Sequence, residues 1–263
     1  AEDVGPADLT AGLVPAGRQA QAVVIAREPA IVCGGPWFVA AVRQCDPQAT
    51  ITWAVPEGRR CAVGQPVVEI RGDARALLTA ERTALNFLQL LSAVATRTAE
   101  YVEAVRGTRA KIVDTRKTLP GLRLAQKYAV RTGGGANHRI GLYDAVLIKE
   151  NHIAAAGGVT PVLRAAAEVA ASADFVQIEV ENLEQLRGAP AAGAKMVLLD
   201  NMDMPALRGA VRLNEGRAVL EISGGVTLER VRELAETGVD RISIGALTKD
   251  VKATDFSMRF KEL

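Results

Sequence analysis

The sequence predicts an α/β protein in which a first domain with an antiparallel sheet precedes an incomplete β/α barrel. Short apolar segments separated by turn residues dominate the first hundred residues, whereas apolar strands and helical segments alternate from residue 107 onwards. Nearly all of these later strands end on a polar residue or a glycine. Such ends are typical of a barrel, where they converge on one mouth. An open doubly wound sheet would need them only at its switch point.

The first domain is expected to comprise residues 1–106. Its predicted strands are rich in alternating apolar residues and lie at 21–33, 50–55, 61–63 and 66–71. A short helix is expected at 36–43. Residues 74–106 form a long segment with apolar residues at helical spacing, which predicts one or two helices.

The second domain is expected to comprise residues 107–249. Predicted strands begin near residues 111, 144, 174, 195, 218 and 240, and predicted helices lie at 122–131, 161–171, 183–192, 204–213 and 228–236. Six clear strands are fewer than the eight of a complete barrel. The tail, residues 250–263, is expected to pack with the first domain.

The composition excludes several classes of function. Lys and Arg total 32 against 30 Asp and Glu, so the net charge of +2 gives no reason to expect a nucleic-acid partner. We find no apolar run long enough for a membrane span and no signal peptide. Three cysteines without C-x-x-C spacing indicate reduced thiols and a cytoplasmic location.

Cationic residues gather at the strand ends and loops of one strand–helix–strand unit, residues 111–152. They are Arg116, Lys117, His138, Arg139, Lys149 and His152. The two strand ends of such a unit lie close together, so the cations repel one another unless an anion is bound. We therefore predict a site for a highly charged anion. The alternative is a solvated basic surface with acidic neighbours. Of the two histidines, His138 is interpreted as functional and His152 as a structural hydrogen-bonding residue.

Two carboxylates, Glu179 and Asp200, end consecutive predicted strands and should face the same mouth. Oxygen ligands of this kind suit Mg²⁺, with phosphates and water completing its coordination. The alternative is an ion pair with Lys149 or Lys117. Glu181 points the same way as Glu179, so the pattern leaves open which of the two is the inner ligand.

Glycines follow the last two predicted strands, at Ser223-Gly224-Gly225 and at Gly245. Accessible backbone amides that lead into helices bind phosphate well, and barrels usually bind it at these two strands. The alternative is a pair of tight turns. No P-loop, dinucleotide-binding or nucleophile-elbow motif is present in the sequence.

Eight sequence motifs, spread over nearly the whole chain, match those of a known protein family. They are E-R-T-A-L-N (81–86), D-T-R-K-T-L-P-G-L-R (114–123), G-G-G-A-N-H-R (133–139), I-K-E-N-H (148–152), I-E-V-E-N-L (178–183), L-L-D-N-M (198–202), I-S-G-G-V (222–226) and I-S-I-G-A-L-T (242–248). In this order they resemble the quinolinate phosphoribosyltransferases.

The resemblance implies an N-terminal α/β sandwich domain, an incomplete seven-stranded β/α barrel and a homodimer with shared active sites. In that dimer each barrel mouth is covered by the partner's first domain. The implied reaction joins quinolinate to 5-phosphoribosyl-1-pyrophosphate with Mg²⁺ and no organic cofactor. Its products are nicotinate mononucleotide, pyrophosphate and CO2, in de novo NAD biosynthesis.

The resemblance also implies roles for individual residues. Quinolinate would be bound by Arg82 of the partner's helix together with Arg116, His138, Arg139 and Lys149. Lys117, Glu179 and Asp200 would be catalytic and would bind the phosphoribosyl donor, with Mg²⁺ at the two carboxylates. Ser223, Gly224, Gly225 and Gly245 would hold the 5-phosphate.

Three alternatives remain open at this point. The first is a paralogous molybdenum-locus protein of the same fold, although that protein lacks the I-K-E-N-H run that contains Lys149. The second is a Schiff-base lyase with Lys149 as nucleophile. The third is a non-catalytic phosphate-binding or scaffold protein.

Overall fold

The computed structural model describes residues 2–261, so residue 1 and the last two residues of the tail lie outside it. The chain divides into two compact units. The first unit comprises Ala1–Ala99, Arg131–Gly133 and Asp250–Leu263, and the second comprises Glu100–Val130 and Gly134–Lys249. This division falls inside a long helix, whereas the predicted boundary at residues 106 and 107 lies just beyond the end of that helix.

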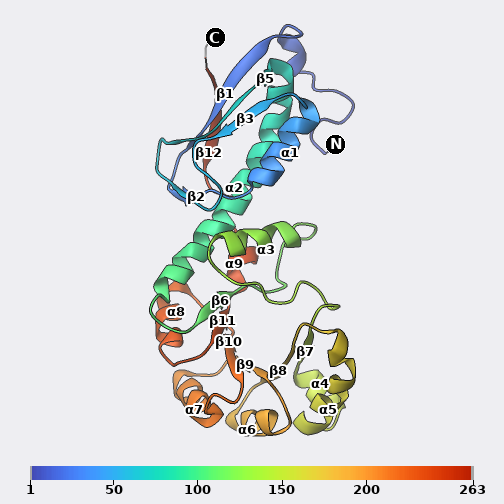
Figure 1. The fold of residues 1–263 in the computed structure, drawn as a ribbon, viewed down its shortest axis with the longest axis vertical. Helices are drawn as coiled ribbons and strands as arrows, with labels where there is room; N and C mark the ends of the chain where they lie inside the picture. The colour runs from blue at the N-terminus through green and yellow to red at the C-terminus, as the bar shows by residue number, and fades with distance from the viewer. Residues whose placement is uncertain (1, 262–263) are drawn as a thin grey trace. The chain divides into compact units, whose positions relative to one another are not determined.

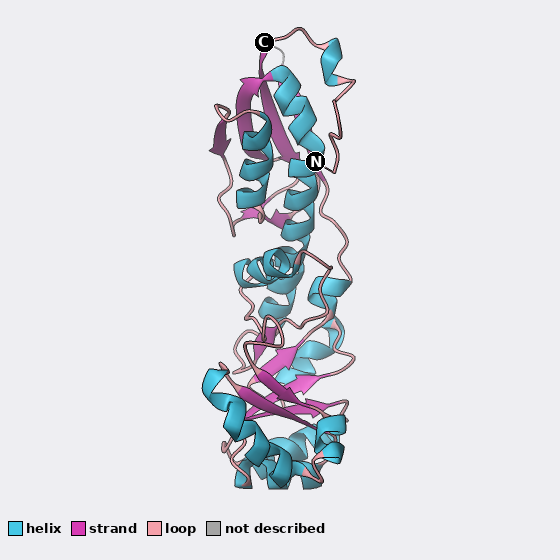
Figure 2. Cartoon of the chain, turned by 90° about the vertical axis from the view of Figure 1, so that its right-hand side faces the viewer, coloured by secondary structure: helices cyan, strands magenta, loops and turns pink. Residues whose placement is uncertain are grey.

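The first unit is built on an antiparallel sheet with the strand order β12-β1-β5-β3. Its strands are β1 (Gln19–Ala26), β3 (Thr50–Trp53), β5 (Pro66–Asp73) and β12 (Phe256–Lys261), and a separate pair is formed by β2 (Ala30–Ile31) and β4 (Arg60–Cys61). A 3₁₀ turn, η1 (Ala11–Leu13), precedes the sheet. Figures 1 and 2 show α1 (Gly35–Cys45) and the first half of α2 (Ala74–Ala104) side by side against one face of the sheet.

The amphipathic pattern of α2 explains how it packs. Leu77, Leu85 and Leu88 are fully buried at helical spacing, in one core with Phe38 of α1 and residues of the sheet. Arg82 lies on the opposite, exposed face of α2. The segment is a single helix of 31 residues.

None of the helices within residues 2–261 is long and apolar enough to cross a membrane.

The second unit contains a parallel sheet with the strand order β6-β11-β10-β9-β8-β7, shown in Figure 1 with α5, α6 and α7 along one side. The strands are β6 (Lys111–Val113), β7 (Val146–Ile148), β8 (Val176–Val180), β9 (Met196–Asp200), β10 (Val219–Ser223) and β11 (Arg241–Ser243). The predicted α/β class, with an antiparallel sheet followed by a parallel one, is confirmed.

The parallel sheet has six strands among the described residues, where the family resemblance implied seven. Its edge strands are β6 and β7. The segment between α3 and β7 contributes only an isolated parallel bridge, from Ala136 to Val113 of β6. Two backbone hydrogen bonds make this bridge, from Ala136 N–H to the Ile112 carbonyl at 2.8 Å and from Asp114 N–H to the Ala136 carbonyl at 3.1 Å, and side-chain hydrogen bonds described below hold the rest of the segment. Among residues 2–261 the hydrogen-bonded sheet thus runs from β6 to β7 without a pairing between these two edge strands.

Helices connect the strands in the predicted alternation. They are α3 (Arg123–Thr132), α4 (Glu150–Ala155), α5 (Val159–Val169) with the short η2 (Ala170–Ser172), α6 (Leu183–Ala191), α7 (Met204–Asn214), α8 (Leu228–Ala235) and α9 (Ala246–Lys249). Asn182 and Asp203 cap α6 and α7 by accepting backbone N–H bonds at 2.9 Å. Helix α4 was not predicted, because its six residues are too few to show a helical period.

Strand register places a row of polar side chains on one face of the parallel sheet. Glu179 of β8 pairs with Leu198 of β9, which pairs with Glu221 of β10, which in turn pairs with Arg241 of β11. Because side chains alternate along a strand, Asp200, two residues after Leu198, projects from the same face. This face carries the candidate site.

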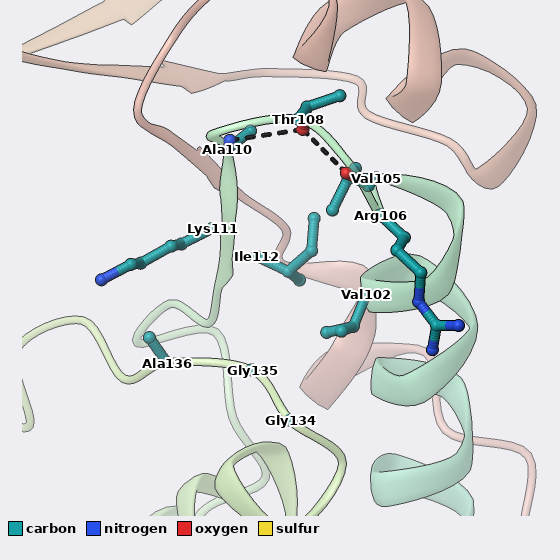
Figure 3. Close-up of a pocket in the computed structure, with 10 residues that line it drawn as sticks. All are labelled: Val102, Val105, Arg106, Thr108, Ala110, Lys111, Ile112, Gly134, Gly135 and Ala136. Carbon is teal, nitrogen blue, oxygen red and sulfur yellow. Dashed lines mark hydrogen bonds between the residues drawn. The ribbon is translucent and has the colours of Figure 1, made fainter.

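A pocket of about 420 Å³ lies away from that site, at the amino end of β6. Figure 3 shows Val102 of α2 and Ile112 of β6 directed towards it, with Lys111 pointing away from Val102. Thr108 lies in the loop that joins α2 to β6, and its Oγ1 atom donates to the Val105 carbonyl at 2.8 Å. Its lining is largely apolar, so this pocket is not where the cations gather.

One buried ion pair ties the end of β6 to α3. Asp114 directly follows β6 and pairs with Lys127 of α3, and their side chains are only 0% and 3% exposed. The Asp114 carboxylate also accepts from the backbone N–H of His138 at 2.8 Å and from Asn137 Nδ2 at 2.6 Å. Burial raises the pKa of Asp114, and the charge of Lys127 opposes that shift.

Lys127→Met should lower the free energy of unfolding by about 3–5 kcal/mol, because it leaves the Asp114 charge buried without a cation to balance it. Chemical denaturation at neutral pH measures this change. Lys195, exposed before β9, provides the matched control, and Lys195→Met should change stability by less than about 0.5 kcal/mol. Equal effects of the two substitutions would contradict a central role for the buried pair.

Candidate active site

The predicted cations lie where β6, the Ala136 bridge and β7 end. Arg116 and Lys117 follow Asp114 after β6, Arg139 follows the bridge segment, and Lys149 follows β7. Burial lowers the pKa of Arg139, and the neighbouring charge of Arg116 lowers it further. The structure therefore places two guanidinium groups close enough to repel each other, as the sequence analysis predicts for an anion site.

Arg139 is held at both its backbone and its side chain. Its backbone N–H donates to His138 Nδ1 at 2.8 Å, and its Nη1 atom donates to the Ala145 carbonyl at 3.3 Å. The Nε atom of Arg116 is buried and has no hydrogen-bond partner within residues 2–261. A buried guanidinium donor without a partner is costly, so an anionic ligand would stabilise it.

Glu179 on β8 faces Lys149 on the neighbouring strand. Lys149 Nζ lies 3.8 Å from Glu179 Oε2, with the two side chains 48% and 12% exposed. Burial raises the pKa of Glu179, Lys149 opposes this, and Asp200 adds to it. Glu181 is exposed, so Glu179 is the inner of the two carboxylates. The ion pair left open by the sequence analysis is thus present, and Asp200 lies beside it.

The loops after β9 and β10 interlock through glycine. Asn201 Nδ2 donates to Asp200 Oδ2 at 2.8 Å, and the Asn201 backbone N–H donates to the Ser223 carbonyl at 3.2 Å. Gly224 has φ of +100°, and a Cβ atom there would overlap the Asn201 side chain. Gly225 also has positive φ and leads towards α8. The turn therefore exposes backbone next to the Asp200 carboxylate.

Gly245 lies between the end of β11 and the start of α9, close to the loop after β6. A Cβ atom at Gly245 would lie 3.0 Å from Lys117 Cδ and 3.6 Å from Thr115 Oγ1. The Thr248 hydroxyl donates to the Lys117 carbonyl at 2.8 Å and fixes the same loop. Lys117 itself is exposed. A cation and the start of α9 thus adjoin each other at the carboxyl end of the sheet.

Most predicted site residues lie at this edge of the second unit, but three of them differ from the rest in location or in hydrogen bonding. Arg82 belongs to the first unit, where it is exposed on α2. His138 is buried, and both of its ring nitrogens bond protein groups. His152 accepts the Lys149 backbone N–H at 3.0 Å through Nδ1 and so stabilises the start of α4.

Sequence reasoning missed three polar residues beneath the cations: Gln177, Glu221 and Arg241. Glu221 and Gln177 are fully buried, and Arg241 donates from Nε to Glu221 Oε2 at 2.8 Å. One signal could have found them. Each lies in an apolar strand an even number of residues before a predicted site residue or a strand-end serine, so it shares the inner face.

A metal ion at this site would need ligands from a bound substrate. Within residues 2–261, no group of three or more His, Cys, Asp or Glu side chains is arranged to hold a metal by itself. Glu179 and Asp200 offer two carboxylates on the same face of adjacent strands. This donor set fits Mg²⁺ that shares its coordination with phosphate oxygens and water.

Two family models match this chain almost end to end. The model described as "Quinolinate phosphoribosyl transferase, C-terminal domain" matches residues 94–259, and the corresponding N-terminal domain model matches residues 8–92. Both matches follow the order in which the motifs occur.

Named relatives agree with these matches. A nicotinate-nucleotide pyrophosphorylase [carboxylating] of Mycobacterium leprae is 44% identical, over 95% of this chain and 89% of its own length. A probable enzyme of the same name from Bacillus subtilis is 40% identical, over 98% and 89%. The solved nicotinate-nucleotide pyrophosphorylase of Francisella tularensis superposes with a TM-score of 0.96 at 43% identity, covering 99% of this chain and 92% of that one.

Glu179→Gln should stabilise the protein at alkaline pH. A carboxyl group whose pKa is raised by folding stabilises the folded state fully only below its ordinary pKa of 4.5, and this contribution is lost as the pH rises through the raised value. Glutamine never ionises, so the melting temperature of the variant should exceed that of the wild type near pH 8, and the difference should shrink towards about pH 4. The exposed Glu181→Gln is the control. A pH-independent difference would refute the proposed cause.

Proposed function

Because this chain belongs to the quinolinate phosphoribosyl transferase family, we propose that it transfers the phosphoribosyl group of 5-phosphoribosyl-1-pyrophosphate to quinolinate. The products would be nicotinate mononucleotide, pyrophosphate and CO2, in de novo NAD biosynthesis. The observation that carries this proposal is a pair of close charge contacts at strand ends of one sheet: Arg139 is crowded by Arg116, and Lys149 faces the Glu179 carboxylate at 3.8 Å. Such an edge binds a dianion next to a group that can stabilise positive charge.

Quinolinate, a pyridine with two adjacent carboxylates, fits the three cations. The planar guanidinium groups of Arg116 and Arg139 can each bind a carboxylate through two parallel hydrogen bonds. The bound dianion would relieve the repulsion between them and would give the buried Arg116 Nε atom an acceptor. Lys149 would neutralise further charge while it remains near Glu179.

The phosphoribosyl donor fits the other half of the same edge. The backbone of the Ser223-Gly224-Gly225 turn, exposed at its two glycines, and that of the half-buried Gly245 suit the 5-phosphate, and Lys117 beside Gly245 suits the pyrophosphate. Glu179 and Asp200 would bind ribose hydroxyls or Mg²⁺. They would also stabilise the positive charge that develops at the anomeric carbon as pyrophosphate leaves. A bound Mg²⁺ would supply charge neutralisation at the pyrophosphate oxygens.

No organic cofactor is needed for the decarboxylation in this proposal. Once the ring nitrogen is glycosylated, the pyridinium attracts electrons. The bond between the ring and the adjacent carboxylate can then break, and its electron pair stays on the ring carbon. CO2 departs, and a proton replaces it on that carbon. The residues of the site need only orient quinolinate and hold its second carboxylate.

The direct test mixes the protein with quinolinate, the phosphoribosyl donor and Mg²⁺ and looks for nicotinate mononucleotide by mass spectrometry. We expect product with quinolinate and not with nicotinate, and loss of product when a chelator removes Mg²⁺. Product from nicotinate alone would sink the substrate assignment. Product in the presence of excess chelator would sink the proposed metal.

Arg139→Lys should lower kcat/KM by a factor that corresponds to about 2–4 kcal/mol of lost transition-state stabilisation. Lysine keeps the positive charge but cannot form the two parallel hydrogen bonds of a guanidinium group. Steady-state kinetics with quinolinate as the varied substrate measures the loss. Arg187→Lys, at an exposed position of α6, is the control and should leave kcat/KM unchanged. Unchanged kinetics in Arg139→Lys would remove Arg139 from the site.

We also propose a homodimer in which Arg82 of one subunit completes the quinolinate site of the other. Arg82 is exposed on α2, where its charge is available to a partner. Its unit lacks the other proposed quinolinate ligands, which all belong to the second unit. The family resemblance of the E-R-T-A-L-N motif supports the same arrangement.

Subunit exchange tests the shared site. Arg82→Ala and Lys149→Ala proteins should each be nearly inactive, because each lacks one quinolinate ligand. A mixture should regain up to about a quarter of the wild-type sites, since half of the randomly formed dimers are mixed and each holds one intact site. Native mass spectrometry confirms exchange. Exchange without recovery of activity would rule the shared site out.

No specific observation favours the rival functions. Lys149 is about half exposed and faces a carboxylate, whereas a Schiff-base lysine is typically placed in an apolar pocket or beside another cation. The three cysteines are free thiols, which supports the proposed cytoplasmic location.

A further inference from the structure

A buried polar cluster lies directly beneath the cations of the proposed quinolinate site. Its members are His138, Gln177, Glu221 and Arg241, from the bridge segment, β8, β10 and β11. His138 Nε2 lies 2.8 Å from Gln177 Oε1 and 3.6 Å from Glu221 Oε1. Gln177 and Glu221 are fully buried. Polar side chains in such a place need a structural or functional reason, because burying them is costly.

The contacts determine where His138 carries its proton. The backbone N–H of Arg139 points at Nδ1 from 2.8 Å, so Nδ1 must accept and therefore has no hydrogen. On the other side of the ring, the oxygens of Gln177 and Glu221 both face Nε2. Both are acceptors, so Nε2 must carry the hydrogen. The ring is neutral, with its proton on Nε2.

Neighbouring charges are compatible with a neutral ring. Burial lowers the pKa of His138, Glu221 opposes that shift, and the cations Arg241 and Lys127 add to it. The Glu221 carboxylate also accepts from Arg241 Nε at 2.8 Å, so its charge is balanced without an imidazolium. A proton on Nδ1 would set two N–H groups against each other at Arg139.

The backbone of His138 is held as firmly as its ring. Its N–H donates to Asp114 Oδ1 at 2.8 Å, and its carbonyl accepts from Lys127 Nζ at 3.0 Å. Phe175 packs edge-on against the ring, with centroids 5.3 Å apart. Every polar atom of His138 is thus used within the protein, and the bond from its Nδ1 atom leads directly to Arg139.

We propose that His138 is a positioning residue, fixed with its proton on Nε2 by Gln177 and Glu221, and that its Nδ1 atom holds the Arg139 backbone in place for the dianionic substrate. Arg241 contributes by balancing the charge of Glu221. This inference deepens the proposed function and replaces the expected direct contact between the His138 ring and quinolinate. It adds Gln177, Glu221 and Arg241 to the residues on which substrate affinity depends.

The first test is the tautomer of His138 in the substrate-free wild-type protein. Nitrogen-15 NMR of the histidine rings is simple here because the chain has only two histidines, and His152→Gln leaves one. We expect a neutral ring with the proton on Nε2 throughout about pH 6–8. An Nδ1–H tautomer, or an imidazolium in that range, would overturn the proposal. This result does not depend on catalytic activity, so it stands apart from failure of the proposed function.

The second test uses two substitutions that each keep one half of the ring. His138→Asn places an amide oxygen near the position of Nδ1, whereas His138→Gln reaches the position of Nε2. Positioning through Nδ1 predicts that Gln raises the KM for quinolinate about tenfold or more. Asn should stay within about threefold of wild type, and neither should change the KM for the phosphoribosyl donor. If both variants instead lose kcat with an unchanged KM for quinolinate, His138 acts on the reacting atoms and the proposal is wrong.

A third variant, Gln177→Met, removes the acceptor at Nε2 with a side chain of similar size. We expect a rise in the KM for quinolinate because the ring loses its closest acceptor, while the Arg139 N–H at Nδ1 and the Glu221 carboxylate keep the proton on Nε2. An unchanged KM for quinolinate would remove Gln177 from the positioning cluster. Wild-type protein that shows the predicted tautomer yet makes no nicotinate mononucleotide would leave the cluster intact and refute the proposed function.

Discussion

The buried Asp114 carboxylate is the constraint on which the site depends. It directly follows β6 and accepts from Lys127 of α3, from the Asn137 side chain and from the backbone of His138. Three segments of the chain are thereby fixed around one charge in a place where the sheet provides only an isolated bridge. Arg116 follows Asp114 by two residues and Arg139 follows His138 by one. The positions of both guanidinium groups therefore follow from this interaction.

The site is assembled from groups that the folded protein destabilises. Arg139 is crowded by Arg116, and burial and Asp200 both disfavour the ionised form of Glu179. Gly224 adopts a backbone conformation that other residues rarely tolerate. Because the net charge of the chain is only +2, this positive field is local. Such arrangements are typical of binding sites, where a ligand supplies the missing stabilisation.

The residues at the strand ends could be predicted from the sequence, whereas the buried polar residues beneath them could not. Strand ends could be predicted because a charged residue or glycine after an apolar run is conspicuous, as at Asp200 and Gly245. Gln177 and Glu221 lie inside apolar strands, and only the register between strands brings them to His138. The pairing of Ala136 with β6 could not be predicted for a similar reason, since a single bridge is too short to give a periodic apolar pattern. The exposure of Arg82 follows from the phase of α2, which an apolar count alone does not give.

The central claim is that the cations at the ends of β6 and β7 hold the two carboxylates of quinolinate. A crystal structure of the protein with quinolinate tests this most directly. We expect one carboxylate to contact the Arg139 guanidinium and the other to contact Arg116 or Lys149, with Glu179 and Asp200 left to face the phosphoribosyl donor. Quinolinate bound with its carboxylates away from these three cations, for example on the Ser223-Gly224-Gly225 turn, would contradict it.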